Sequence, residues 1–253
     1  MTDALGHRCK IALVVPSVNT IVQPECDALR PDGVTNHIAR IPTPNRVLKN
    51  DGDFRAHVEG MRAGIFQAVD DALSVEPDFL VMGLSLEAFW DGYDGSYALL
   101  DRVAARAGIP STMGSSGIDA ALKAYAAARP GGIKTVGIVT PHRPEGDAKV
   151  RHWFEEAGYT VAALHSFNCQ TPIGIAHVSP AEMHDAFDRV DGPAIDALIQ
   201  VGTNLSGVSV AAKEEGQRRK PVIAINAATY WHALRSAGIN DRISGFGQLL
   251  ADH

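Results

Sequence analysis

The chain has 253 residues, of which 45% are hydrophobic, 21% charged and 6% aromatic, and its formal net charge is -6. This length suffices for one large or two small domains, and the composition excludes disordered, collagen-like and coiled-coil proteins. An acidic chain without a long run of Lys and Arg lacks the positive surface that a phosphate backbone requires, so we expect no nucleic-acid partner.

The cysteines and the apolar segments narrow the class further. Cys9, Cys26 and Cys169 form no CxxC pair and no spacing suited to zinc, so we expect neither a disulfide framework nor a metal site. The first residues do not resemble a signal peptide, and no stretch approaches the roughly 20 apolar residues of a membrane span. We therefore expect a cytoplasmic protein with no membrane partner, and a homo-oligomer stays open.

Short apolar runs alternate with longer stretches of helical periodicity along the whole chain. Strands are predicted at residues 11–15, 34–41, 79–82, 109–112, 134–139, 160–165, 197–201 and 222–225. Helices are predicted from about residue 21 and at residues 54–73, 97–107, 115–128, 147–156, 181–190 and 230–237. This order is typical of βα units around a mostly parallel sheet.

The second half of the sequence repeats the first. IALVVPSVNT matches TVGIVTPHRP, PDFLVMGLSLE matches IDALIQVGTNLS, and IPSTMGSS matches KPVIAINAA. The paired landmarks are Pro16 and Pro141, Gly83 and Gly202, and Pro110 and Pro221, which lie 125, 119 and 111 positions apart. The repeat predicts an α/β fold of two similar lobes related by a pseudo-twofold axis, each a four-stranded mostly parallel sheet flanked by helices. The lobes are expected at residues 1–113 and 114–253, with a ligand cleft between them.

Polar residues cluster where the strands of both halves end. Ser17 and Asn19 lie between the first strand and the helix that follows, where free backbone N–H groups suit a carboxylate. The alternative is that such residues only cap the helix. A similar cluster at residues 203–206 favours an anion site. The predicted substrate-binding residues are Ser17, Asn19, Gly83, Ser85, Gly202, Thr203, Asn204 and Ser206.

These segments resemble the aspartate/glutamate racemase superfamily, within it the branch that contains maleate cis-trans isomerase and arylmalonate decarboxylase. The resemblance spans nearly the whole chain, and its more specific parts are VVPSVNTIVQPE at 14–25, IVTPH at 138–142 and VGTNLS at 201–206. GLSLEAFWDG at 83–92 looks like the decarboxylase's loop of the same place. The resemblance implies a cofactor-independent isomerase or lyase that acts on a small carboxylate through an enolate-like intermediate.

The family's usual chemistry depends on one or two cysteines just beyond the third strand of each half. The matching positions here are Gly83 and Gly202, so the resemblance implies that both usual thiols are missing. A tyrosine of the family, in the loop after the first strand of the second half, corresponds to His142.

Three residues are candidates for the chemistry. His142 can act as a general acid or base or bind an enolate oxygen, unless it is a solvent-exposed loop histidine. Glu87 can act as a base if its apolar neighbours raise its pKa. The alternative is a carboxylate that the helix dipole favours at the start of a helix. Cys169 is either a relocated thiol or a small buried residue. Asn226 is expected to cap a helix from Thr229, with a ligand contact left open, and the remaining histidines, His57 among them, show no metal-ligand pattern.

Three functions remain open. No GxGxxG or GxxxxGK[ST] motif is present, so no cofactor is expected. The leading interpretation is the isomerase or lyase. The second is a hydrolase of a small cyclic amide or lactone, in which His142 or Glu87 activates water. The third is a binding protein for a small carboxylate without catalysis.

Overall fold

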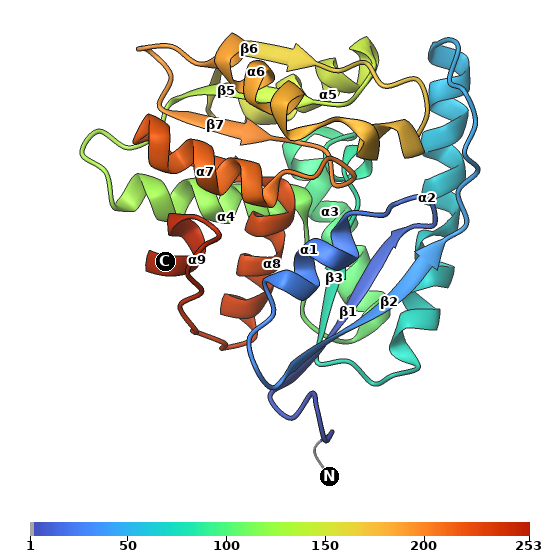
Figure 1. The fold of residues 1–253 in the computed structure, drawn as a ribbon. Helices are drawn as coiled ribbons and strands as arrows, with labels where there is room; N and C mark the ends of the chain where they lie inside the picture. Colours follow the sequence, from blue (N-terminus) through green and yellow to red (C-terminus); the bar gives the residue numbers. More distant parts are fainter. Residues whose placement is uncertain (1–2) are drawn as a thin grey trace.

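Two four-stranded sheets, each made of parallel strands, form the centre of the molecule in the computed structural model, which describes residues 3–253 (Figure 1). The first contains β1 (Cys9–Pro16), β2 (Val34–Ile41), β3 (Phe79–Met82) and β4 (Ser111–Met113), in the order β2-β1-β3-β4. The second contains β5 (Thr135–Thr140), β6 (Thr160–Ser166), β7 (Ala197–Gln200) and β8 (Val222–Ala224), in the order β6-β5-β7-β8. The two orders are equivalent, so the fold class predicted from the internal repeat is confirmed.

Helices connect and flank the strands. They are α1 (Val22–Ala28), α2 (Asp51–Leu73), α3 (Gly92–Ala107), α4 (Gly114–Ala127), α5 (Pro144–Glu156), α6 (Pro180–Val190), α7 (Val208–Arg218), α8 (Ile225–Ser236) and α9 (Gln248–Asp252), with short 3-10 turns at Leu86–Ala88 (η1) and Ile173–His177 (η2). Several helices begin earlier than predicted. α2 begins at Asp51 because the Asn50 side chain accepts a hydrogen bond from the Asp53 N–H at 2.9 Å and caps it.

The early start of α8 overturns one expectation. α8 begins at Ile225, directly after β8, so Asn226 lies in its first turn. A residue in that position cannot cap a helix that begins at Thr229, and this prediction was wrong. The periodicity of the sequence marks only the apolar part of the helix, whereas hydrogen bonding extends it to the end of the strand.

Helices α4 and α8 cross in backbone contact. A Cβ atom added at Gly117 would lie 2.6 Å from Cα of Thr229, and one added at Gly114 would lie 2.5 Å from the Ile225 side chain. α8 also packs against β3 and β4 of the first sheet. The first sheet ends at Met113 and the second begins at Thr135. Because α8 comes from the second half of the chain, that half also helps to cover the first sheet.

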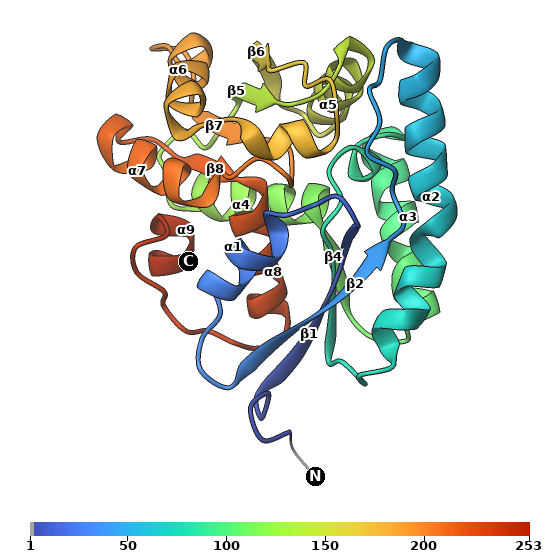
Figure 2. The same cartoon turned by 45° about the vertical axis from the view of Figure 1, so that its right-hand side comes forward.

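The central strands are mostly apolar and buried, because both faces of each sheet are covered. β3 and β7 are buried at every residue, as is typical of parallel sheets between helices. The N-terminal end of α2 reaches the second lobe, where Arg55 Nε lies 2.8 Å from Glu145 Oε1 of α5 (Figure 2). Within residues 3–253, none of the helices is long and apolar enough to cross a membrane.

Candidate active site

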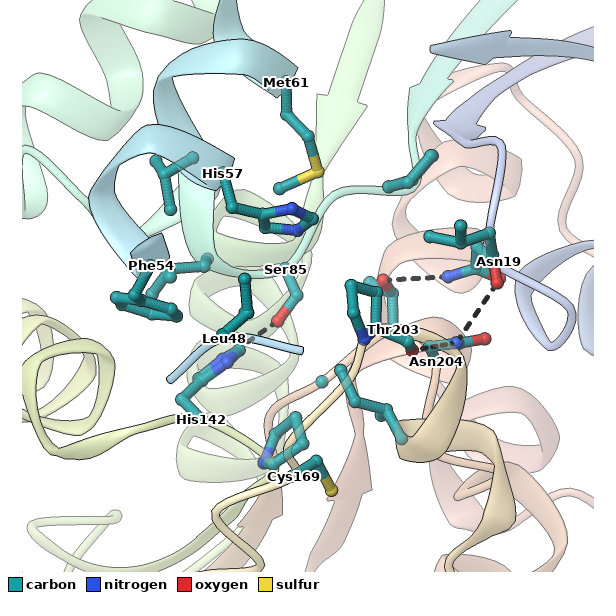
Figure 3. A pocket seen from close by; sticks show the side chains of 18 of the residues that line it. Asn19, Leu48, Phe54, His57, Met61, Ser85, His142, Cys169, Thr203 and Asn204 are labelled. Atoms are coloured by element: carbon teal, nitrogen blue, oxygen red, sulfur yellow. Dashed lines mark hydrogen bonds between the residues drawn. The ribbon is translucent and has the colours of Figure 1, made fainter. Parts of the chain in front are cut away.

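The strand ends of both sheets surround one pocket, with a cavity volume of about 90 Å³ (Figure 3). Its walls come from the loops after β1, β3, β5, β6 and β7, from the segment before α2, and from α2 itself. The lining residues include Asn19, Leu48, Phe54, His57, Val58, Met61, Ser85, Leu86, Glu87, His142, Arg143, Cys169, Gly202, Thr203 and Asn204. Because parallel strands end at the same edge of a sheet, two facing sheets bring these loops together.

Asn19, Thr203 and Asn204 form the polar wall of the pocket. The Asn19 amide donates to Thr203 Oγ1 at 3.3 Å, while its carbonyl oxygen accepts from the backbone N–H groups of Ile21 and Val22 at the start of α1. Asn19 therefore accepts from two N–H groups at the start of α1, two residues before its N-cap Ile21, and also lines the pocket, so a role at the helix start does not exclude a ligand contact. The bond to Thr203 joins the loops of the two lobes.

The side chain of Asn204 is fully engaged in holding loops together. Its carbonyl oxygen accepts from the Thr20 N–H at 2.9 Å, and its amide donates to the carbonyl oxygens of Pro172 at 3.0 Å and Val18 at 3.5 Å. Asn204 thus ties three segments at the rim of the pocket. What it can offer a ligand directly is its backbone N–H.

The loop after β7 presents backbone donors. Gly202 has φ +143°, a conformation that favours glycine, and a Cβ atom there would lie 2.7 Å from the ring of Pro141. Within the described residues, the backbone N–H groups of Thr203 and Asn204 have no hydrogen-bond acceptor. Two adjacent free N–H groups beside the Thr203 hydroxyl and the Asn19 amide suit a carboxylate or enolate oxygen.

His142 is buried and held by Ser85. Its Nε2 lies 3.1 Å from Ser85 Oγ, a contact that joins the loops after β3 and β5. Burial lowers the pKa of His142 to about 4, so the imidazole is neutral at neutral pH. It can then donate or accept one hydrogen bond at each nitrogen, but it does not supply the proton of an imidazolium.

Glu87 lies in η1 and is only 2% exposed. Burial raises its pKa to about 7, and the nearby positive charge of Arg62 only partly offsets this effect. Its Oε1 has no hydrogen-bond partner among residues 3–253. A carboxyl group that is half protonated near neutral pH and lines a pocket is suited to proton transfer.

Cys169 is the one cysteine in the pocket lining, whereas Cys9 lies at the start of β1 and Cys26 is buried in α1. Burial raises the pKa of the Cys169 thiol to about 11, and the charge of Glu182 adds to this. The thiol is therefore protonated at neutral pH, which makes it a poor nucleophile.

Three residues expected to bind substrate do not line the pocket. The Ser17 hydroxyl accepts from the Thr43 N–H at 2.9 Å, and Ser206 Oγ lies 3.5 Å from Glu25 Oε1 behind the loop. Gly83 contributes only its carbonyl oxygen, which accepts from Thr203 Oγ1 at 3.3 Å. They follow strands whose neighbouring residues reach the pocket, but hydrogen bonds to distant segments of the chain engage them elsewhere.

Among the lining residues that the sequence did not predict, two are basic side chains. His57 of α2 points into the pocket (Figure 3), and Arg143 lines it while donating to the carbonyl oxygen of Leu48 at 2.9 Å. Arg143 follows His142 directly and could have been considered as a cation for an acidic ligand. His57 stands in an apolar helix face formed with Phe54, Val58 and Met61, which is the signal that could have found it.

Comparisons with known proteins agree with this architecture. A sequence profile of the arylmalonate decarboxylase family matches residues 11–250. The chain belongs to the arylmalonate decarboxylase family. The resemblance and the enzyme class expected from the sequence, isomerase or lyase, are thereby confirmed.

Individual relatives of this family member are distant. The maleate isomerases of Alcaligenes faecalis and Pseudomonas putida are each 21% identical to it, over 96% of this chain and 96% or 97% of theirs. The solved structure of Nocardia farcinica maleate cis-trans isomerase has a TM-score of 0.85 at 19% identity, covering 95% of this chain and 97% of the other. The crystal structure of arylmalonate decarboxylase has a TM-score of 0.74 at 17% identity, covering 95% and 98%.

The thiol chemistry of one structural neighbour contrasts with this site. A variant of the Nocardia farcinica isomerase was solved with a covalent succinylcysteine intermediate. In the present family member, Gly83 directly follows β3, and Gly202 lies two positions after the last residue of β7. That these glycines occupy the family's thiol positions stays a prediction.

Proposed function

We propose that this family member is a lyase that decarboxylates a small malonate-type acid with an apolar substituent, with proton transfer by Glu87. One observation carries the proposal. The pocket combines donors for a carboxylate with a carboxyl group whose pKa is about 7, while its only thiol has a pKa of about 11. Addition of a thiolate to a double bond is therefore disfavoured relative to protonation by a carboxylic acid.

The polar wall binds the carboxylate that the product retains. The backbone N–H groups of Thr203 and Asn204 and the Asn19 amide donate to its oxygens, and neutral His142, oriented by Ser85, donates to the oxygen that gains charge in the intermediate. These donors are fixed before the reaction, so they stabilise the developing enolate without reorganising.

The apolar wall faces the other part of the substrate. Leu48, Phe54, Val58 and Leu86 form a packed apolar cluster that lines the pocket. The bond between the α-carbon and the departing carboxyl group breaks, carbon dioxide leaves, and the electron pair becomes the enolate of the retained carboxylate. The protonated Glu87 carboxyl then gives its proton to the α-carbon and is reprotonated from water. An apolar wall favours the loss of carbon dioxide because the departing carboxyl group loses its charge in that step.

The test is product analysis by NMR in deuterated water with phenylmalonate, an alkylmalonate and maleate as substrates. The expected result is carbon dioxide release and a product with one deuterium at the α-carbon. Formation of fumarate from maleate without carbon dioxide release would assign an isomerase instead. Ring opening of a cyclic amide or lactone would favour the hydrolase, and tight binding without any turnover would favour a binding protein.

A further inference from the structure

His57 occupies an unusual place on α2. Phe54, His57, Val58 and Met61 follow the spacing of one helix face, and all four line the pocket. The His57 side chain is only 8% exposed and points into the pocket, on the side of Ser85 and His142 and across from Asn19 and Thr203 (Figure 3). A polar ring therefore interrupts a wall that is otherwise apolar.

Neither ring nitrogen of His57 has a hydrogen-bond partner in the part of the chain that the structure describes, and Nδ1 is inaccessible to solvent. Two other enclosed histidines are partnered: His142 by Ser85, and His232 by Thr112 Oγ1 at 2.7 Å. Buried polar groups without partners are rare in folded proteins because each costs stability. Leucine would serve packing better at position 57, so packing does not explain the histidine.

The imidazole of His57 is uncharged at neutral pH, because burial and the positive charge of Arg46 both lower its pKa. Because Nδ1 is enclosed, a ligand can reach only Nε2, which in a neutral imidazole donates or accepts one hydrogen bond according to the tautomer. A charged ligand group beside Phe54, Val58 and Met61 would lose its hydration and gain only a neutral partner. An uncharged group that can either donate or accept, such as a hydroxyl, matches Nε2 in either tautomer.

We propose that His57 determines substrate specificity by hydrogen-bonding an uncharged polar group, a hydroxyl in the simplest case, on the otherwise apolar substituent of the acid. This inference rests on the proposed function, because the carboxylate bound at Asn19 and Thr203 sets the direction in which the substituent points. The substrate class is then a small acid with a polar group on its apolar part, rather than a purely hydrocarbon-substituted one.

The binding test uses straight-chain acids from butanoate to hexanoate and their terminally hydroxylated forms, measured by isothermal titration calorimetry. For the chain length that reaches His57, the wild type should bind the hydroxylated acid about 10-fold more tightly than its parent. His57→Leu should reverse this preference, and His57→Gln should keep part of it. Parent acids that bind as well as the hydroxylated ones at every length, or an unchanged preference in His57→Leu, would overturn the inference. If no acid binds, the carboxylate site of the proposed function fails, and this inference fails with it.

A second measurement separates specificity from folding. Because His57 has no partner to lose, His57→Leu without ligand should have an unchanged or higher melting temperature. The matched control, His232→Leu, removes a hydrogen bond to Thr112 and should melt several degrees lower. A drop in His57→Leu as large as that of the control would mean that His57 is structural, and the inference would be wrong.

Discussion

The side-chain amide of Asn226 donates to Glu25 Oε2 at 2.6 Å and to the carbonyl oxygen of Thr203 at 3.0 Å. Glu25 comes from α1 in the first lobe, and its other oxygen accepts from the Val208 N–H at 3.0 Å, at the start of α7. The carboxyl group of Glu25 therefore fastens both ends of the loop that presents Thr203 and Asn204.

Glu25→Ala should loosen this loop. Each lost hydrogen bond to a charged group costs roughly 1.5 to 3 kcal/mol, so we expect a lower free energy of unfolding and weaker carboxylate binding. Urea unfolding and calorimetry of the same samples measure both. Glu25→Gln, which keeps one acceptor, should lie between the wild type and Glu25→Ala. Wild-type carboxylate affinity in Glu25→Ala would show that the loop does not depend on this contact.

Glu87→Gln should lower kcat by about 10²- to 10⁴-fold, the usual contribution of a general acid. Since the protonated form is the active one, wild-type kcat should fall as the pH rises through about 7. The residual activity of Glu87→Gln should lack this falling limb, because glutamine does not titrate. A profile of kcat against pH for both proteins tests this prediction. If kcat of Glu87→Gln still falls as the pH rises through about 7, another group donates the proton.

The same group should affect stability with a defined sign. The pKa of Glu87 is raised in the folded protein from 4.5 to about 7, so its contribution is fully present below pH 4.5 and is lost as the pH rises through about 7. Glu87→Gln escapes this loss, and its stability relative to the wild type should improve by roughly 3 kcal/mol between acidic and mildly alkaline pH. Denaturant unfolding at both pH values tests this, and other titrating groups cancel because both proteins share them. If the difference in unfolding free energy between the two proteins is the same at both pH values, burial does not raise the pKa of Glu87 in the folded protein.

Cys169→Ser should keep most of the activity. The thiol is protonated at neutral pH because its pKa is raised to about 11, so chemistry that needs a thiolate has little of it available. Steady-state kinetics and circular dichroism of the variant test this together. If a folded Cys169→Ser protein loses more than about 100-fold in kcat, a loss typical of a removed catalytic group, Cys169 is the relocated thiol and Glu87 is not the main proton donor.

Substitutions of Thr203 and Asn204 should both weaken carboxylate binding but should lower the melting temperature by different amounts. Thr203→Val removes two long contacts between the lobes, to the Asn19 amide and the Gly83 carbonyl oxygen at 3.3 Å each, and should weaken carboxylate binding by roughly 10-fold with a small drop in melting temperature. Asn204→Ala removes three contacts between loops and should lower the melting temperature by several degrees as well. Calorimetry and thermal melting measure both effects. An equal loss of melting temperature in the two variants would contradict the larger structural role of the Asn204 side chain.

The sequence was most informative where it repeated itself. The repeat predicted two equivalent sheets, and strand ends then placed Asn19, Thr203 and His142 near one another without any long-range information. These residues lie within a few positions of a buried strand, so the course of the backbone decides where they are.

What the sequence could not provide depends on contacts between distant segments. Ser17 follows the same strand as Asn19, but its hydroxyl is used by Thr43, whose position depends on the chain beyond β2. His57 reaches the pocket only because α2 extends toward the second lobe, where Arg55 meets Glu145. Neither interaction has a signature in local periodicity or motif spacing.

The close crossing of α4 and α8 limits how the molecule can move. Many two-lobed binding proteins close on a ligand as a clamshell, by rotation about a flexible hinge. Here Gly117 has no room for even a methyl group against the backbone of Thr229, and α8 also packs on the first sheet. The packing of α8 on the first sheet makes wide hinge opening between the sheets costly, since packed interfaces resist continuous deformation. Differences in substrate access among relatives would therefore be sought in the loops around the pocket and not in a hinge between the sheets.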